Sequence, residues 1–197
     1  MNDPAAVSSR SGQSIRAATP SDINWVHTHL QQAIDDSAFY GDRFKTHEKA
    51  HFSETFLTSL MVTDPWHVTI GLHHGQRAGF VITLPEFGTI WTSWVYTVPE
   101  FNRTAIGLTI MRKAIAHWDN GRFHKTATYV KPENVGGLKI FQRFGFRQVA
   151  LLKNQILGED FILLERDLSK TVEGYDHGIN VGRLGRLKFR LAHLFKS

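Results

Sequence analysis

A short segment of small and polar residues, Asn102 to Gly107, lies where a strand pattern gives way to a helix pattern. The preceding residues, Thr89 to Val98, are rich in Thr, Trp, Val and Tyr and carry no charge, which predicts a strand. Pro99 ends it, because proline has no N–H for a ladder. A helix follows, since apolar residues recur every four positions, at Ile106, Ile110, Ala114 and Trp118. The first N–H groups of a helix have no internal acceptor and lie at the positive end of its dipole, so the segment predicts a site for an anion such as a pyrophosphate.

Two common phosphate-binding motifs, Gly-x4-Gly-Lys-Ser/Thr and Gly-x-Gly-x-x-Gly, are absent from this segment. The stretch instead resembles the acetyl-CoA-binding segment of the Gcn5-related N-acetyltransferases, where a strand, a Val-x-Pro-like exit and Gln/Arg-x-x-Gly-x-Gly/Ala open a helix. Pro99 and Gly107 match that pattern. Asn102 stands in place of the usual Gln or Arg, and Ala105 in place of the first Gly. An ordinary strand–turn–helix without a ligand is the alternative reading of this segment alone.

A second segment, Asn134 to Phe146, resembles the same family, in which an Asn, a small residue, a Tyr and then Gly-Phe follow the fifth strand. Asn134, Gly137 and the pair Gly145-Phe146 stand at the expected spacings, whereas Phe141 stands where the Tyr is usual. Two weak motifs on the expected elements are stronger than either alone. The resemblance covers Ile15 to Asp167.

The resemblance implies that acetyl-CoA is the co-substrate. It also implies that both segments contact this molecule. The pantetheine arm would hydrogen-bond along the strand, and the pyrophosphate would lie over the amides that open the helix. Arg103 would add positive charge or remain a solvated surface residue, and Asn134 would contact the cofactor arm, cap its own helix, or do both. The implied cofactor-binding residues are Val95, Tyr96, Thr97, Asn102, Arg103, Thr104, Ala105, Ile106, Gly107, Leu108, Asn134 and Phe141.

Acetyl transfer from a thioester to an amine needs a proton acceptor, a donor for the developing oxyanion and an acid for the thiolate. Phe141 cannot donate a proton, so Tyr96, with Tyr129 as an alternative, is the candidate acid, and Asn134 is the second catalytic candidate. Relatives place a Glu or His, as the general base, on the fourth strand, about where Trp91 and Ser93 lie in this chain. The remaining candidate bases are Glu86, Glu100, His67 and His124. A module that binds acyl-CoA without catalysis is therefore an alternative function.

The composition predicts one globular domain, because 197 residues with 42% hydrophobic and 21% charged side chains can bury a sizeable core. There is no cysteine, which excludes disulfides, thiolate metal sites and a Cys nucleophile. The histidines supply no set completed by a carboxylate ligand, so no metal is expected. Without a signal peptide or an apolar run long enough for a membrane span, the cytoplasm is the expected location.

The pattern along the chain predicts an α/β fold with a mixed, mostly antiparallel sheet of six to seven strands and helices on both faces, the order of the Gcn5-related N-acetyltransferase fold. The predicted strands are 15–18, 67–72, 78–84, 89–98, 125–130, 146–153 and 160–165. The predicted helices are 19–37, 47–60 capped by Thr46, 106–118 and 134–144, with the aromatic segment 39–44 irregular. That segment would either wall a substrate pocket or plug a core edge.

Three regions are expected: a disordered leader (1–13), an acetyltransferase domain (14–168) and a Gly-rich linker with a basic amphipathic helix (169–197). The last region holds six basic and two acidic residues, a surplus of four within the net charge of +5. Its apolar stripe would pack on the domain or on a second copy in a homodimer. Peripheral membrane contact or an adaptor role is the alternative, and nucleic acid is not an expected partner.

The acceptor is expected to be a small-molecule or protein amine that takes the acetyl group directly in a ternary complex, because no activated nucleophile is visible. Trp91 and Trp94 lie on opposite faces of their predicted strand. If either faces the cleft, the acceptor or the acyl group would be flat or apolar.

Overall fold

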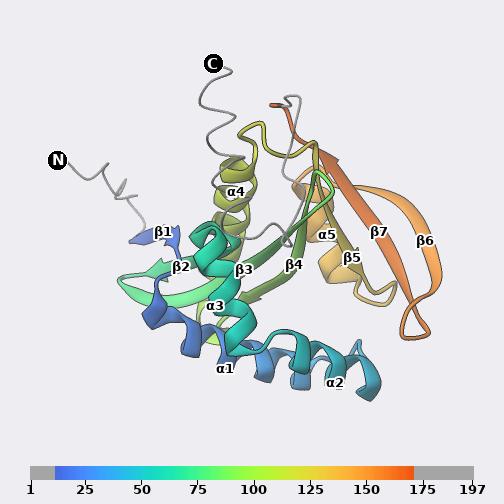
Figure 1. The fold of residues 1–197 in the computed structure, drawn as a ribbon, viewed down its shortest axis with the longest axis horizontal. Helices are drawn as coiled ribbons and strands as arrows, with labels where there is room; N and C mark the ends of the chain where they lie inside the picture. Colours follow the sequence, from blue (N-terminus) through green and yellow to red (C-terminus); the bar gives the residue numbers. More distant parts are fainter. Residues whose placement is uncertain (1–11, 171–197) are drawn as a thin grey trace.

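The computed structural model describes residues 12–170, which form a single seven-stranded sheet covered by helices on both faces (Figure 1). Each predicted strand is present, and the fifth has the predicted bounds. The strands are β1 (Gln13–Ala17), β2 (Val68–His73), β3 (Gln76–Glu86), β4 (Thr89–Thr97), β5 (Lys125–Val130), β6 (Arg147–Ile156) and β7 (Glu159–Asp167). The helices are α1 (Ile23–Asp36), α2 (Asp42–His51), α3 (Glu54–Thr63), α4 (Ile106–Trp118) and α5 (Val135–Arg143).

The strand order is β1-β2-β3-β4-β5-β7-β6, and every pair is antiparallel except the central pair of β4 and β5. The hairpins β2–β3, β3–β4 and β6–β7 account for most of the antiparallel pairing. Helix α4 carries the chain from the end of β4 back to the start of β5, and such a crossover makes the two strands parallel. The one parallel pair therefore lies in the middle of the sheet.

One face of the sheet is covered by α1, α2 and α3, and the other by α4 and α5. Val68, Ile70, Phe80 and Ile82 point toward α1 and α3 and form one core cluster with them. Val81 and Ile90 point the other way, into a second cluster built around Ile106, Ile110 and Trp118 of α4. Alternation along the strands produces the two clusters, because successive side chains leave a strand on opposite faces.

Close contact between α4 and the sheet depends on a pair of glycines. Gly71 of β2 and Gly79 of β3 are directly opposed in the ladder. A Cβ on Gly71 would overlap the side chain of Ile110, and one on Gly79 would lie 3.1 Å from it. Their absent side chains let Ile110 reach the sheet, which fixes the position of α4 and of the turn that precedes it.

The prediction of one helix over 47–60 is wrong. The chain forms two helices, α2 and α3, separated at Phe52 and Ser53. Phe52 leaves the helical conformation with ψ of 48°, and its ring is buried in the α1–α3 cluster. Ser53 begins α3 because its side chain accepts a hydrogen bond from the Phe56 N–H. Thr46 lies inside α2 rather than capping it, and the predicted irregular segment is shorter, because α2 begins at Asp42.

The predicted leader, apart from its last two residues, and the predicted amphipathic helix of the C-terminal region lie outside the described residues. Within residues 12–170, no helix combines the length and the apolar character that a membrane span requires.

Candidate active site

The two central parallel strands separate after three residue pairs. The pairs are Thr89–Lys125, Ile90–Thr126 and Trp91–Ala127, although β4 continues to Thr97 and β5 to Val130. Just beyond the last pair, the Thr128 hydroxyl donates to the Thr92 carbonyl at 2.8 Å, and the hydroxyls of Thr92 and Thr126 lie 3.4 Å apart. Three threonine side chains thus lie at the point at which the strands diverge. From there on, the edge of β4 that faces β5 has no ladder partner.

An irregularity in β4 occurs at the same level. On the neighbouring strand, Ile82 pairs with Trp94 whereas the next residue, Thr83, pairs with Thr92. Ser93 is therefore an extra residue in β4, a β-bulge that bends the strand and increases its twist. The bulge turns the remainder of β4 away from β5, and it lies where the sheet opens.

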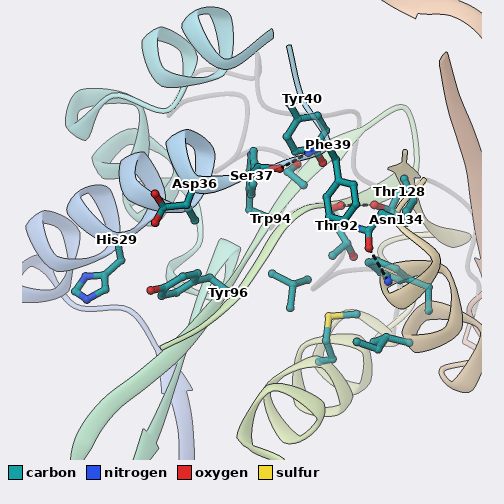
Figure 2. A pocket seen from close by; sticks show the side chains of 18 of the residues that line it. His29, Asp36, Ser37, Phe39, Tyr40, Thr92, Trp94, Tyr96, Thr128 and Asn134 are labelled. Atoms are coloured by element: carbon teal, nitrogen blue, oxygen red, sulfur yellow. Dashed lines mark hydrogen bonds between the residues drawn. The ribbon is translucent and has the colours of Figure 1, made fainter. Parts of the chain in front are cut away.

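A cleft of about 730 Å³ occupies the opening and is lined from both faces of the sheet. From the α1 side come His29, Asp36 and Tyr40, and from the α4–α5 side come Met111 and Phe141. In Figure 2, His29, Asp36 and Tyr96 lie toward one end of the cleft, whereas Thr92, Thr128 and Asn134 gather at the other. The cleft is thus bounded by residues from the helical layers on both faces of the sheet.

Four of the predicted cofactor-binding residues line this cleft: Val95, Tyr96, Asn134 and Phe141. Thr97 and residues 102–108 are not among its lining residues. Residues 102–108 nevertheless start close to the cleft. Val98, Pro99 and Glu100 line the cleft and lead directly into the turn before α4. Met111 also lines it and stands one helical turn beyond Gly107 on the same face of α4.

The turn before α4 is held by specific contacts. Ala105 adopts a left-handed conformation, with φ of 60°, immediately before the helix. The Thr104 hydroxyl donates to the Phe101 carbonyl at 2.7 Å, and Gln13 Nε2 donates to the Thr104 carbonyl at 2.5 Å. Gly107 faces Thr97, whose hydroxyl would lie 2.5 Å from a Cβ at that position. These contacts fix the first turn of α4 against the end of β4.

Asn134 performs the capping role that its sequence position predicted. Its Oδ1 accepts a hydrogen bond from the Gly137 N–H at 2.8 Å at the start of α5. The same residue lines the cleft, so capping holds its side chain at the cleft wall. A contact with a cofactor arm remains a prediction.

The candidate acids on the strands differ in their surroundings. Partial burial raises the pKa of Tyr96, and the charges of Asp36 and Glu100 raise it further. Partial burial and the charge of Glu86 raise the pKa of Tyr129, which stacks on Trp91 at a centroid distance of 4.9 Å. Both phenols are therefore protonated near neutral pH and can donate a hydrogen bond. Phe141 packs on Phe146 at 5.0 Å and contributes no polar atom.

Of the predicted candidate bases, only Glu100 lines the cleft. His67 is buried and stacks on Trp118 at 4.7 Å, on the far side of the core, and Glu86 and His124 are not among the residues that line the opening. Ser93 lines the cleft, but a serine hydroxyl is a poor base.

Sequence reasoning missed Asp36, Tyr40 and Glu48 as site residues. Partial burial raises the pKa of Tyr40 to about 12, and the charges of Glu48 and Glu159 act in the same direction. One available signal was the aromatic segment 39–44, and both of the alternatives that it offered occur. Phe39 and Tyr40 wall the cleft, whereas Phe44 is buried beneath them.

A second missed signal is the run His47-Glu48-Lys49-Ala50-His51, which has the His-Glu-x-x-His spacing of zinc-binding helices. Both rings do lie on one face of α2, parallel and 6.2 Å apart. The Glu48 carboxylate, however, accepts a hydrogen bond from Trp94 Nε1 at 2.9 Å. Across residues 12–170 no three His, Asp or Glu side chains converge as a metal site requires, so the spacing carries no metal assignment.

Neither a protein-family model nor a curated protein sequence matches the chain. Solved structures do match it. A phosphinothricin acetyltransferase of the GNAT superfamily from Sinorhizobium meliloti, in complex with AcCoA, aligns with a TM-score of 0.65 and 15% identity over 83% of this chain and 95% of its own. PaiA N-acetyltransferase from Thermoplasma acidophilum, in complex with coenzyme A, aligns with a TM-score of 0.64 and 17% identity over 79% and 98%. Ard1 from Thermoplasma volcanium aligns with a TM-score of 0.64 and 16% identity over 81% and 99%.

These similarities confirm the predicted fold class, the mixed seven-stranded sheet with helices on both faces. At such low sequence identity they concern the fold alone.

Proposed function

We propose that this chain, which has the fold of the Gcn5-related N-acetyltransferases, transfers an acetyl group from acetyl-CoA to an amine. The observation that carries the proposal is the separation of β4 and β5 after Trp91 and Ala127, which opens a cleft in the middle of the sheet. A ternary complex needs access from two sides, one for each substrate, and this cleft is lined from both faces of the sheet. Direct transfer follows, because both substrates would meet at the unpaired edge of β4.

The donor side of the cleft is the face that carries α4 and α5. Acetyl-CoA, which supplies the thioester, would lie with its pantetheine along Val95 to Thr97 and its pyrophosphate at the turn from Asn102 to Leu108. Helix N–H groups without internal acceptors favour phosphate there, and Arg103 is exposed beside them. Asn134 and Phe141 line the cleft opposite β4 and would flank the arm.

Acetyl transfer requires an oxyanion donor, an acid for the thiolate and a proton acceptor, and we assign each role to groups of this chain. N–H groups on the free edge of β4, next to the bulge at Ser93, would stabilise the oxygen that becomes anionic. Tyr96, kept protonated by its raised pKa, would donate a proton to the leaving thiolate. Asp36 and Glu100 lie at the same end of the cleft and would accept the amine proton through water.

The test is calorimetric titration of acetyl-CoA and free CoA into the wild type, Ala105→Glu and Ala105→Gln. The two variants have nearly the same bulk, but only the glutamate would repel a pyrophosphate. We expect binding to the wild type and to Ala105→Gln, and at least a tenfold loss in Ala105→Glu. Ala50→Glu, on the exposed side of α2, is the control for added charge elsewhere. An absence of binding to the wild type would refute the proposal.

Turnover can be followed through the thiol of released CoA. Since the chain contains no cysteine, a thiol reagent reports only the product. A panel of amines that raises the rate of thiol release above the rate without an amine would establish transfer.

A non-catalytic acyl-CoA-binding module is the second candidate function, and Phe141 favours it, because this ring lines the cleft without a proton to donate. On that alternative the wild type binds acetyl-CoA but releases no thiol with any amine. On the enzymatic proposal Tyr96→Phe lowers turnover by about 10²-fold, the range of general acid catalysis, while acetyl-CoA binding is retained.

A further inference from the structure

A smaller chamber of about 150 Å³ adjoins the cleft on the side of α2. Tyr40, Trp94 and Tyr129 line both spaces, so the chamber lies directly beside the opening between β4 and β5. Aromatic rings dominate its wall: Tyr40, Phe44, Trp91, Trp94, Tyr129 and Phe161. Some of these rings therefore face a space that a ligand can enter, rather than the core.

These rings pack against one another and form one wall of the chamber. Tyr40 stacks on Phe44 at 4.4 Å and meets Trp94 edge to face at 5.9 Å, and Phe44 lies 5.6 Å from Phe161. Phe44 and Phe161 are buried and hold the others in place. A cavity of about 150 Å³ can hold benzene, so the chamber matches one aromatic ring in size, and the aromatic side chains of its mixed lining favour such a ring.

One carboxylate, that of Glu48, lies in this aromatic wall. Its side chain is 15% exposed, and it accepts the Trp94 Nε1 hydrogen bond at 2.9 Å. A carboxylate can accept about four hydrogen bonds, so capacity remains for a ligand. The nearest nitrogen of His47 lies 3.6 Å away, on an exposed side chain. Glu48 lines the chamber but not the cleft, and its bond to Trp94, which lines both, places a negative charge in the chamber wall.

The charge of the lining is opposite to that of the whole chain. The chain carries a net charge of +5, yet the charged side chains lining the cleft and the chamber are Asp36, Glu48 and Glu100, with no lysine or arginine among the described lining residues. Lys131 reaches the Phe161 ring at 5.0 Å, but it is paired with Glu159 at 3.1 Å. A cleft with acidic and aromatic walls concentrates cations and excludes anionic acceptors.

We propose that the acceptor is a small arylalkylamine that binds in its ammonium form, with its ring in the chamber and its charge attracted by Glu48. This inference rests on the proposed function and specifies its acceptor. The ring would lie against Trp91, Trp94 and Tyr129, which are half-buried and line the chamber, and the short alkyl link would bring the nitrogen to the bulge at Ser93. Deprotonation in the cleft would then free the nitrogen lone pair for attack on the thioester carbonyl, with CoA leaving as the thiol.

The test uses the full-length protein and compares compounds that carry an aromatic ring, a positive charge, or both. 2-Phenylethylamine has both, propylamine has only the charge, 2-phenylethanol has only the ring, and spermidine has several charges without a ring. Calorimetry in the presence of CoA measures binding, and thiol release measures transfer. We expect 2-phenylethylamine to bind at least tenfold more tightly than propylamine and 2-phenylethanol, and to have a higher kcat/KM than spermidine.

The role of Glu48 is tested by Glu48→Gln, which keeps an acceptor for the Trp94 indole and removes the charge. We expect its KM for 2-phenylethylamine to rise at least tenfold with acetyl-CoA binding unchanged. Glu54→Gln is the matched control, because Glu54 is a half-exposed glutamate on α3 outside both spaces. If Glu48→Gln changes the KM for 2-phenylethylamine no more than Glu54→Gln does, the inference that Glu48 attracts the acceptor is wrong.

The two proposals fail in different ways. If acetyl-CoA binds and propylamine or spermidine is acetylated as well as 2-phenylethylamine, the arylalkylamine inference is wrong and the proposed function stands. If acetyl-CoA does not bind at all, both are wrong.

Discussion

Asp22 is the residue on which the α1 side of the molecule depends most. Its carboxylate is fully buried, accepts hydrogen bonds from Arg16 Nη1 at 2.6 Å and Arg77 Nε at 2.7 Å, and also accepts the Thr19 N–H at 2.7 Å. Burial by itself would raise the pKa of Asp22, but these hydrogen bonds outweigh it and hold the pKa well below its usual range. One side chain thereby joins β1, α1 and β3.

Asp22→Asn is expected to lower the free energy of unfolding by about 1.5–3 kcal/mol, the range for hydrogen bonds to a charged group, because the two arginines left behind are each about a third exposed. The control Asp167→Asn breaks an exposed pair with Arg147 and should have a much smaller effect. Urea unfolding of both variants measures the difference. Equal effects would mean that the buried network does not stabilise the fold.

The same residue predicts a pH dependence. The unfolded pKa of an aspartate is about 3.9, and the folded pKa of Asp22 lies below it. The stabilisation is therefore complete above about pH 4 and is lost as the pH falls toward the folded value. Urea unfolding at a series of pH values between 7 and 2 should show this loss in the wild type and a smaller slope in Asp22→Asn. Parallel curves would contradict the assignment.

Ala105 shows strain at the start of α4, because an alanine with φ of 60° costs about 1–2 kcal/mol relative to a right-handed conformation. Ala105→Gly should remove that strain, although glycine is more flexible in the unfolded chain. We expect a net gain of about 0.5–1 kcal/mol, measured as a higher urea midpoint. A loss of stability would show that the methyl group makes a contact that outweighs the strain.

At the scale of elements, the break between α2 and α3 determines the shape of the α1–α2 side of the cleft, where the proposed acceptor would bind. Phe52 buries its ring in the α1–α3 cluster, and Ser53 restarts the helix in a new direction. An unbroken helix would carry Glu48 and Phe44 on one continuous line with α3. The break separates α2, which presents Phe44, Glu48 and His51 to the chamber, from α3, which packs Leu57 and Leu60 into the core.

Ser53→Ala should destabilise the protein by about 1 kcal/mol, since it removes the cap of the Phe56 N–H. Ser59→Ala is the matched control, because Ser59 lies on the exposed side of the same helix and its hydroxyl donates only to the Phe56 carbonyl. Thermal unfolding of both variants tests this expectation. If Ser59→Ala is the more destabilising, the start of α3 is held by packing rather than by its cap.

At the scale of the molecule, the sheet separates the α1–α3 layer from the α4–α5 layer. Residues of both layers line the opening between β4 and β5. The donor would occupy the α4–α5 layer and the acceptor the α1–α2 layer. The edge strands β1 and β6 take no part in lining the cleft or the chamber, apart from Ile156 at the end of β6. Ligand effects should therefore be concentrated in the middle of the sheet.

Hydrogen exchange with and without acetyl-CoA tests this arrangement. At a concentration of 100 times Kd, binding should stabilise the folded protein by about 2.7 kcal/mol. Protection should rise most in residues 93–108 and 134–141 and least in β1 and in most of β6. Protection spread evenly over the sheet would mean that the ligand stabilises the fold without occupying the central opening.

The sequence by itself determined the elements and their order. Strand-favouring composition between turn residues located all seven strands, and an apolar stripe located α1 and α4, because these patterns depend on which side chains one element buries. The same rule failed at Phe52 and Ser53, since apolar residues continue at helical spacing through the break. A serine can cap a helix or sit within one, and only packing decides which.

The tertiary structure alone decided the site. Val95, Tyr96 and Asn134 could be proposed from local motifs, but Asp36, Tyr40 and Glu48 come from segments more than 40 residues away from β4 in the chain. No local pattern records which side chains meet across a sheet opening. The bulge at Ser93 and the early end of the β4–β5 ladder are properties of strand pairing, and it is this pairing that brings acids and aromatic rings to one cleft.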